Sequence, residues 1–100
     1  MPCCNRVLEE MIYRTSDAMI NANINKCNTE SYAQTLRNLL EKQFQTTFEI
    51  IVSTEDFAAK IRFRENLLCK TIVNEKIVLA YATPEPYALL PYNVEGSLTV

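Results

Sequence analysis

The chain has 100 residues, of which 48% are hydrophobic and 22% charged, and this length suits one compact domain with a small core. The 12 acidic and 10 basic residues give a net charge of -2, and lysine and arginine are nowhere as dense as nucleic-acid binding requires. No apolar run approaches the roughly 20 residues that span a bilayer. We therefore expect neither a nucleic-acid partner nor a transmembrane segment.

Residues 5–21 have the spacing of an amphipathic helix, with Asn5 or Cys4 as its N-cap. The apolar positions lie three and four residues apart, at Val7, Leu8, Met11, Ile12, Thr15, Met19 and Ile20. The asparagine-rich stretch 21–28 contains Cys27 and is predicted to be a connection, because asparagine bonds its own backbone in turns.

A second helix is predicted to follow, capped by Asn28 or Thr29. Its apolar stripe consists of Tyr32, Ala33, Leu36, Leu39, Leu40 and Phe44. After Gln45 the apolar residues alternate with polar ones, which predicts strands at residues 48–53 and 57–64.

Two further β-rich runs, residues 67–73 and 76–82, are separated by two residues, which fits a tight antiparallel hairpin. The predicted fold class is therefore α+β, with two helices packed on one face of a four-stranded antiparallel sheet. This domain is expected to cover residues 1–83, and the proline-containing residues 84–100 are expected to form a C-terminal tail. The residues predicted to be buried include Leu8, Met11, Ile12, Leu36, Leu39, Leu40, Phe48, Ile50, Phe57, Ile61 and Ile72.

Four cysteines and no histidine suit a small extracellular domain with disulfides better than an intracellular catalyst. Without histidine, a general base has to be a carboxylate, a lysine or a cysteine, and the compact acidic pair Glu55 and Asp56 lies in a predicted turn. The cysteines also lack the paired short spacing of a zinc site. We expect no enzyme activity, no cofactor and no metal.

The basic residues Lys60, Arg62 and Arg64 alternate along a predicted strand and are the candidate binding residues. Lys70, on a neighbouring strand, is expected to extend this stripe. Two interpretations remain open. The stripe attracts an acidic glycan or the carboxylates of a partner protein, or it is a solvated face that discourages edge-to-edge pairing of sheets.

The order of these features resembles the ground-like domain, the C-terminal module of a group of nematode secreted proteins that includes hedgehog-related families. The resemblance spans residues 3–82 and is carried by Cys3-Cys4-Asn5 with Leu8 and Met11, by residues 48–53 leading to Asp56-Phe57, by Cys69, and by residues 78–82. It implies a non-enzymatic extracellular interaction module, a secreted signalling or matrix-associated protein of nematode development. The implied partner is an extracellular protein or an acidic glycan.

The alternative is a small intracellular adaptor or thiol-redox protein with reduced cysteines. The first 20 residues lack the basic, apolar and small-residue order of a secretory signal. An extracellular location therefore requires either a signal upstream of Met1 in a longer product or a sequence that begins at a domain boundary, and we favour the boundary.

The family pattern also has cysteines at the position of Val52 and near Leu79. Both are replaced by apolar residues here, as expected when one whole disulfide is lost. The resemblance therefore implies that Val52 and Leu79 lie close together in the fold.

The remaining four cysteines allow three pairings, and adjacent cysteines rarely bond each other because the ring is strained. We therefore expect Cys69 to bond either Cys3 or Cys4. Cys27 then bonds whichever of Cys3 and Cys4 is not bonded to Cys69, stays a free thiol or forms an intermolecular bridge.

Overall fold

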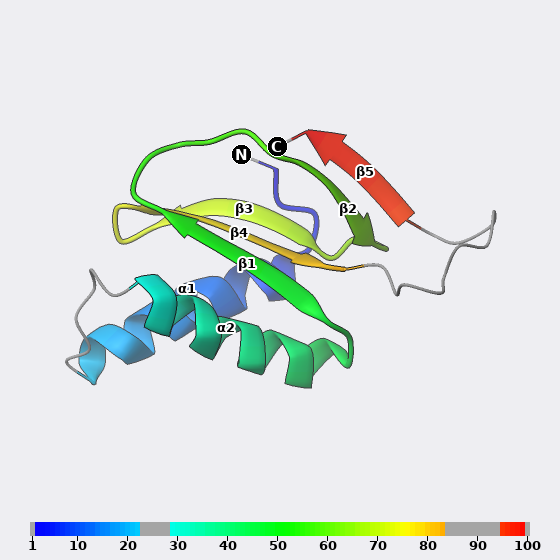
Figure 1. The fold of residues 1–100 in the computed structure, drawn as a ribbon. Helices are drawn as coiled ribbons and strands as arrows, with labels where there is room; N and C mark the ends of the chain where they lie inside the picture. The colour runs from blue at the N-terminus through cyan, green and yellow to red at the C-terminus, as the bar shows by residue number, and fades with distance from the viewer. Residues whose placement is uncertain (1, 23–28, 84–94, 100) are drawn as a thin grey trace.

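The computed structural model describes residues 2–22, 29–83 and 95–99 (Figure 1). Its elements in chain order are α1 (Arg6–Asn21), α2 (Thr29–Phe44), β1 (Phe48–Ser53), β2 (Lys60–Arg64), β3 (Leu68–Val73), β4 (Lys76–Ala82) and β5 (Glu95–Thr99). Neither helix in these ranges is long and apolar enough to cross a membrane. The expectations for Cys27 and for residues 84–94 of the tail lie outside the described residues.

The two helices form where the apolar spacing predicts them and contact each other along part of their length. Asn5 caps α1, because its side-chain oxygen accepts a hydrogen bond from the Leu8 N–H at 3.1 Å. Tyr32 of α2 donates its hydroxyl proton to the Ile12 carbonyl of α1 at 2.9 Å, and burial raises the pKa of this phenol. The buried apolar residues of the helices are Leu8, Ile12, Met19, Tyr32, Leu36 and Leu40.

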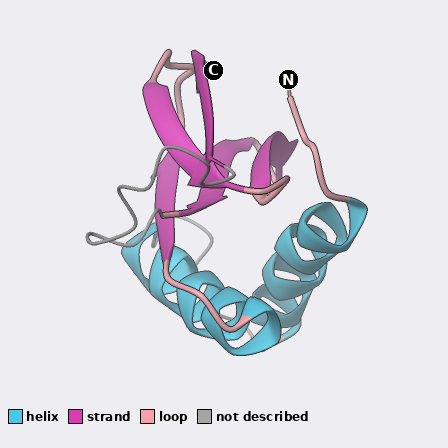
Figure 2. Cartoon of the chain, turned by 90° about the vertical axis from the view of Figure 1, so that its right-hand side faces the viewer, coloured by secondary structure: helices cyan, strands magenta, loops and turns pink. Residues whose placement is uncertain are grey.

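The main sheet is antiparallel, with the strand order β1-β4-β3, and both helices cover the same face of it (Figures 1 and 2). Asn74 and Glu75 connect β3 to β4 with φ values of 48° and 65°, which is the two-residue hairpin with two positive φ angles. The α+β class and the placement of two helices on one face are therefore confirmed.

The predicted position of β2 in a four-stranded sheet is wrong. β2 pairs instead with β5 as a separate antiparallel two-stranded sheet, in which Lys60 lies opposite Thr99. Ile61 and Phe63 of β2 pack against Leu68 and Leu79, on the sheet face opposite the helices. The alternation in residues 57–64 correctly marks the buried side of this strand, but such a pattern does not specify which strand is its neighbour.

Two of the residues predicted to be buried are exposed, namely Leu39 at 43% and Ile72 at 55%. Leu39 lies outside the part of α2 that faces the sheet, which is marked by Leu36 and Leu40. Ile72 lies on the opposite side of the sheet, where the buried cluster under β2 does not reach it. Met11, Ile50 and Phe57 are half-buried, and the other six predicted core residues are buried.

Val52 and Leu79 lie on neighbouring strands, as expected, but they are not directly opposite each other. The register sets Val52 opposite Val78, and Leu79 opposite Ile51. Val52 packs on the helix side of the sheet, whereas Leu79 belongs to the cluster under β2. Their expected closeness on neighbouring strands is therefore confirmed, but a disulfide between these two positions does not suit the register, because their side chains point to opposite faces.

Candidate functional site

The N-terminal segment 2–4 lies along the outer edge of β3 and is linked to it covalently. Cys3 and Cys69 form a disulfide across an antiparallel bridge. On either side of this bond, the Cys4 N–H donates to the Leu68 carbonyl at 2.8 Å and the Lys70 N–H donates to the Pro2 carbonyl at 2.7 Å. The segment therefore covers the edge of β3 and connects the start of α1 to the sheet.

The disulfide is one of the two Cys69 pairings that the sequence left open. Cys4 is exposed and its thiol is free in the described part of the chain. The Cys3 and Cys69 sulfurs also lie within 4.8 Å of a Glu9 carboxylate oxygen. Because the two sulfurs are bonded to each other, they do not present the thiolates that a metal ion requires.

The three candidate binding residues lie on one side of β2. Lys60 and Arg62 are exposed, while the intervening Ile61 and Phe63 are buried against the main sheet. Arg64 is half-buried, and its Nη1 donates to the Thr46 hydroxyl at 3.2 Å. The alternation of buried and exposed side chains thus directs the cationic groups away from the core.

Lys70 does not extend this stripe, contrary to the expectation from the sequence. Its side chain is only 5% exposed, and its Nζ lies 3.0 Å from Asp56 Oδ1. The same ammonium donates to the Phe57 carbonyl and lies 4.5 Å from the centroid of the Phe57 ring. Lys70 therefore holds the connection between β1 and β2 against β3, and its charge is not available to a partner.

Asp56 is the acidic member of this cluster. Hydrogen bonds from Lys70 and from the Phe57 N–H hold the pKa of the Asp56 carboxyl below its usual value. The Phe57 N–H donates to Asp56 Oδ1 at 2.7 Å, a local hydrogen bond to the residue that directly follows Asp56. Sequence reasoning missed the role of Lys70, although a lysine inside a mostly apolar strand is a signal of an internal partner.

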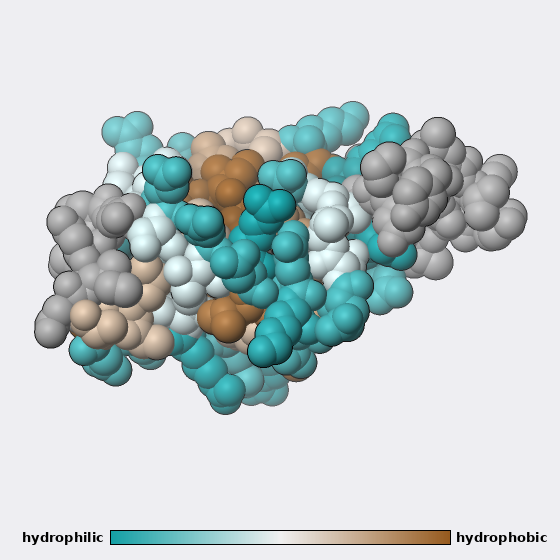
Figure 3. Space-filling view, turned by 60° about the horizontal axis from the view of Figure 1, so that its bottom comes forward, coloured by the Kyte–Doolittle hydropathy of each residue, from teal (hydrophilic) through white to brown (hydrophobic). Residues whose placement is uncertain are grey.

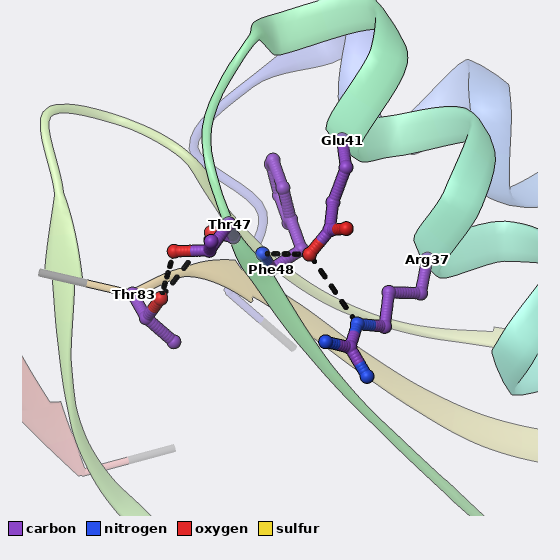
Figure 4. A network of polar contacts seen from close by, with 5 residues as sticks. All are labelled: Arg37, Glu41, Thr47, Phe48 and Thr83. Atoms are coloured by element: carbon purple, nitrogen blue, oxygen red, sulfur yellow. Dashed lines mark hydrogen bonds and ion pairs between the residues drawn. The ribbon is translucent and has the colours of Figure 1, made fainter. Parts of the chain in front are cut away.

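A second polar cluster joins α2 to β1 (Figure 4). Glu41 Oε2 accepts hydrogen bonds from the Phe48 N–H at 2.9 Å and from Arg37 Nε at 3.3 Å. The Phe48 N–H is the main cause that holds the pKa of the Glu41 carboxyl below its usual value. Thr47 and Thr83 bond each other through their hydroxyls beside this turn. These hydrogen bonds fix the turn that connects α2 to β1.

These features define a small α+β domain with two helices, a three-stranded sheet and a disulfide that links its N-terminal segment to that sheet. The family model of the Ground-like domain matches residues 1–81, and the chain belongs to this family. The resemblance seen in the sequence is thereby confirmed. No curated protein matches the sequence.

Proposed function

We propose that this domain is a non-enzymatic extracellular interaction module of a hedgehog-related nematode protein, with a secreted signalling or matrix-associated role in development. The Cys3–Cys69 disulfide is the observation that carries the proposal. Such bonds persist in oxidising compartments and are reduced in the cytosol. Membership of the Ground-like family supports the same location. The intracellular alternative requires both cysteines to be reduced, which leaves the edge of β3 without its covalent link.

The proposed binding surface is the outer side of β2. Lys60 and Arg62 are exposed there, and the buried Ile61 and Phe63 hold the strand in place beneath them. The protein as a whole carries a net charge of -2, so attraction of an anionic partner depends on this local arrangement. An acidic glycan or an acidic protein surface has the complementary charge.

Replacing Lys60 and Arg62 together with serine is expected to weaken binding to heparin, used as an acidic-glycan probe, by roughly 3-fold to 30-fold, since exposed ion pairs each contribute about 0.3 to 1 kcal/mol. Elution from a heparin column in a sodium chloride gradient measures the effect. Binding of the unmodified protein should itself weaken steeply with salt.

The matched control replaces Arg6 and Arg14 of α1 with serine. It changes the net charge equally, and these side chains are 90% and 82% exposed. The control should elute with the unmodified protein. If the β2 variant also elutes there, the stripe is a solvated face and not a binding surface.

A further inference from the structure

The strand order places β1 at one edge of the main sheet. β4 pairs with one side of β1, and no described strand pairs with its other side. The opposite edge of the sheet, at β3, is covered by the N-terminal segment 2–4 and its disulfide. Among the described elements, the edge at β3 is therefore covered and the edge at β1 is open.

The hydrogen-bond pattern shows which groups of β1 face outward. The Thr83 N–H donates to the Thr47 carbonyl at 2.9 Å, so Thr47 and Thr83 form a hydrogen-bonded pair. This pair determines which residues of β1 direct their backbone groups toward β4. Because residues of an antiparallel strand direct their backbone groups alternately to the two sides, Phe48, Ile50 and Val52 direct theirs away from β4. These three residues present the unpaired row of the edge.

One outward group is already satisfied, since the Phe48 N–H donates to Glu41 (Figure 4). The N–H and C=O groups of Ile50 and Val52 have no hydrogen-bond partner among the described residues. The strand has the sequence FEIIVS, with one charge and none of the lysine or proline that commonly blocks an edge. In addition, Ile51 is 39% exposed on the face away from the helices.

We propose that β1 pairs with β1 of a second copy of this chain, antiparallel about a two-fold axis at Ile51, which joins the two sheets into one. In this register Ile50 lies opposite Val52 of the second copy. The free N–H of each residue donates to the free C=O of the other, which gives two hydrogen bonds, and the two-fold axis repeats this pair. Phe48 keeps its bond to Glu41, which limits the pairing to the centre of the strand.

The side chains of β1 favour this self-pairing. The two exposed Ile51 side chains face each other at the axis, where opposing side chains are closest, and remove each other from water. Glu49, the charged residue of the strand, lies opposite Ser53 of the second copy, so no like charges oppose each other. If the two-fold axis were at Ile50 instead, Phe48 would lie opposite Val52 of the second copy. That pairing needs the Phe48 N–H, which already donates to Glu41.

A hollow beside the edge has room for a side chain of the added strand. A hollow of about 350 Å³ lies between α2 and β1 and is lined in part by Ala33, Gln34, Asn38 and Ile50. Val52 of the second copy, opposite Ile50, directs its side chain toward this helix-side hollow. Figure 3 shows that hydrophobic surface reaches the solvent on the helix side of the molecule, between hydrophilic side chains.

The test exploits the two-fold axis at Ile51. In sedimentation equilibrium of the full chain, the mass should rise with concentration from 11.5 kDa toward twice that value. Ile51→Lys and Ile51→Glu should each lose the dimer, because like charges then face each other at the axis. An equal mixture of the two variants should associate again, because lysine then faces glutamate. Circular dichroism and the unfolding midpoint verify that each variant is folded.

Ile72→Lys is the matched control, since Ile72 is also exposed on the face away from the helices but lies on β3. This variant should dimerise like the unmodified protein. Three results each overturn the proposal: an unmodified protein that is monomeric at every concentration, an Ile51→Lys variant that still dimerises, or a mixture of the Ile51 variants that stays monomeric. In the first case the β1 edge is left to a different protein or peptide.

Discussion

Replacing Cys69 with alanine is expected to lower the free energy of unfolding by about 4 kcal/mol under oxidising conditions, because the disulfide closes a loop with a sequence separation of 66 residues. This loss is comparable to the whole stability of a small domain. The reason is that the crosslink restricts the unfolded chain and holds segment 2–4 on the edge of β3. Chemical denaturation followed by circular dichroism measures the change.

Cys4→Ala is the control, since Cys4 is the exposed neighbour and its thiol is free among the described residues. It should change the unfolding free energy by less than about 0.5 kcal/mol. Reductant should destabilise the unmodified protein to a similar extent as Cys69→Ala, and it should leave that variant unchanged. An unchanged unfolding midpoint for Cys69→Ala in oxidising buffer would show that the bond does not stabilise the fold.

Lys70→Ala is expected to destabilise the domain by about 3 kcal/mol, because it removes a charge-assisted hydrogen bond and a cation–π contact from a buried position. The connection between β1 and β2 then loses its attachment to β3. Lys60→Ala, which changes the charge equally at an exposed position, should cost less than about 0.5 kcal/mol. Equal losses in both variants would contradict the structural role of Lys70.

The same cluster predicts a difference in acid stability. The folded protein holds the pKa of Asp56 below its unfolded value of about 4, so the stabilisation is complete above that pH and is lost as the pH falls through the folded pKa. Lys70→Ala removes the largest cause of the shift. Its unfolding free energy should therefore fall less steeply with acid than that of the unmodified protein, and identical slopes would exclude the Lys70–Asp56 link.

The elements that depend on local sequence could be predicted from the sequence. Both helices have a three-and-four spacing of apolar residues, and Asn5 is a residue type that caps helices. The β3–β4 hairpin is likewise set by two turn residues between two β-rich runs. The family resemblance correctly identified the Ground-like domain.

The arrangements that depend on distant pairing could not be predicted in the same way. β2 pairs with β5, although the β3–β4 hairpin lies between these two strands in the sequence. Neither strand carries a pattern that specifies the other. The alternation that correctly placed Lys60 and Arg62 on an exposed side gave no information on Lys70, whose partners come from a separate connection. The opposite orientations of Val52 and Leu79 likewise depend on a register that only the folded sheet defines.

The oxidation state of Cys3 and Cys69 in protein isolated from its natural source tests the proposed extracellular, disulfide-linked domain most directly. Alkylation without reductant, followed by trypsin digestion and mass spectrometry, reports this state. We expect peptide 65–70 to be linked to an N-terminal peptide that ends at Arg6, with Cys3 in the bond. Recovery of Cys3 and Cys69 in their alkylated forms would contradict the proposal and favour the intracellular alternative.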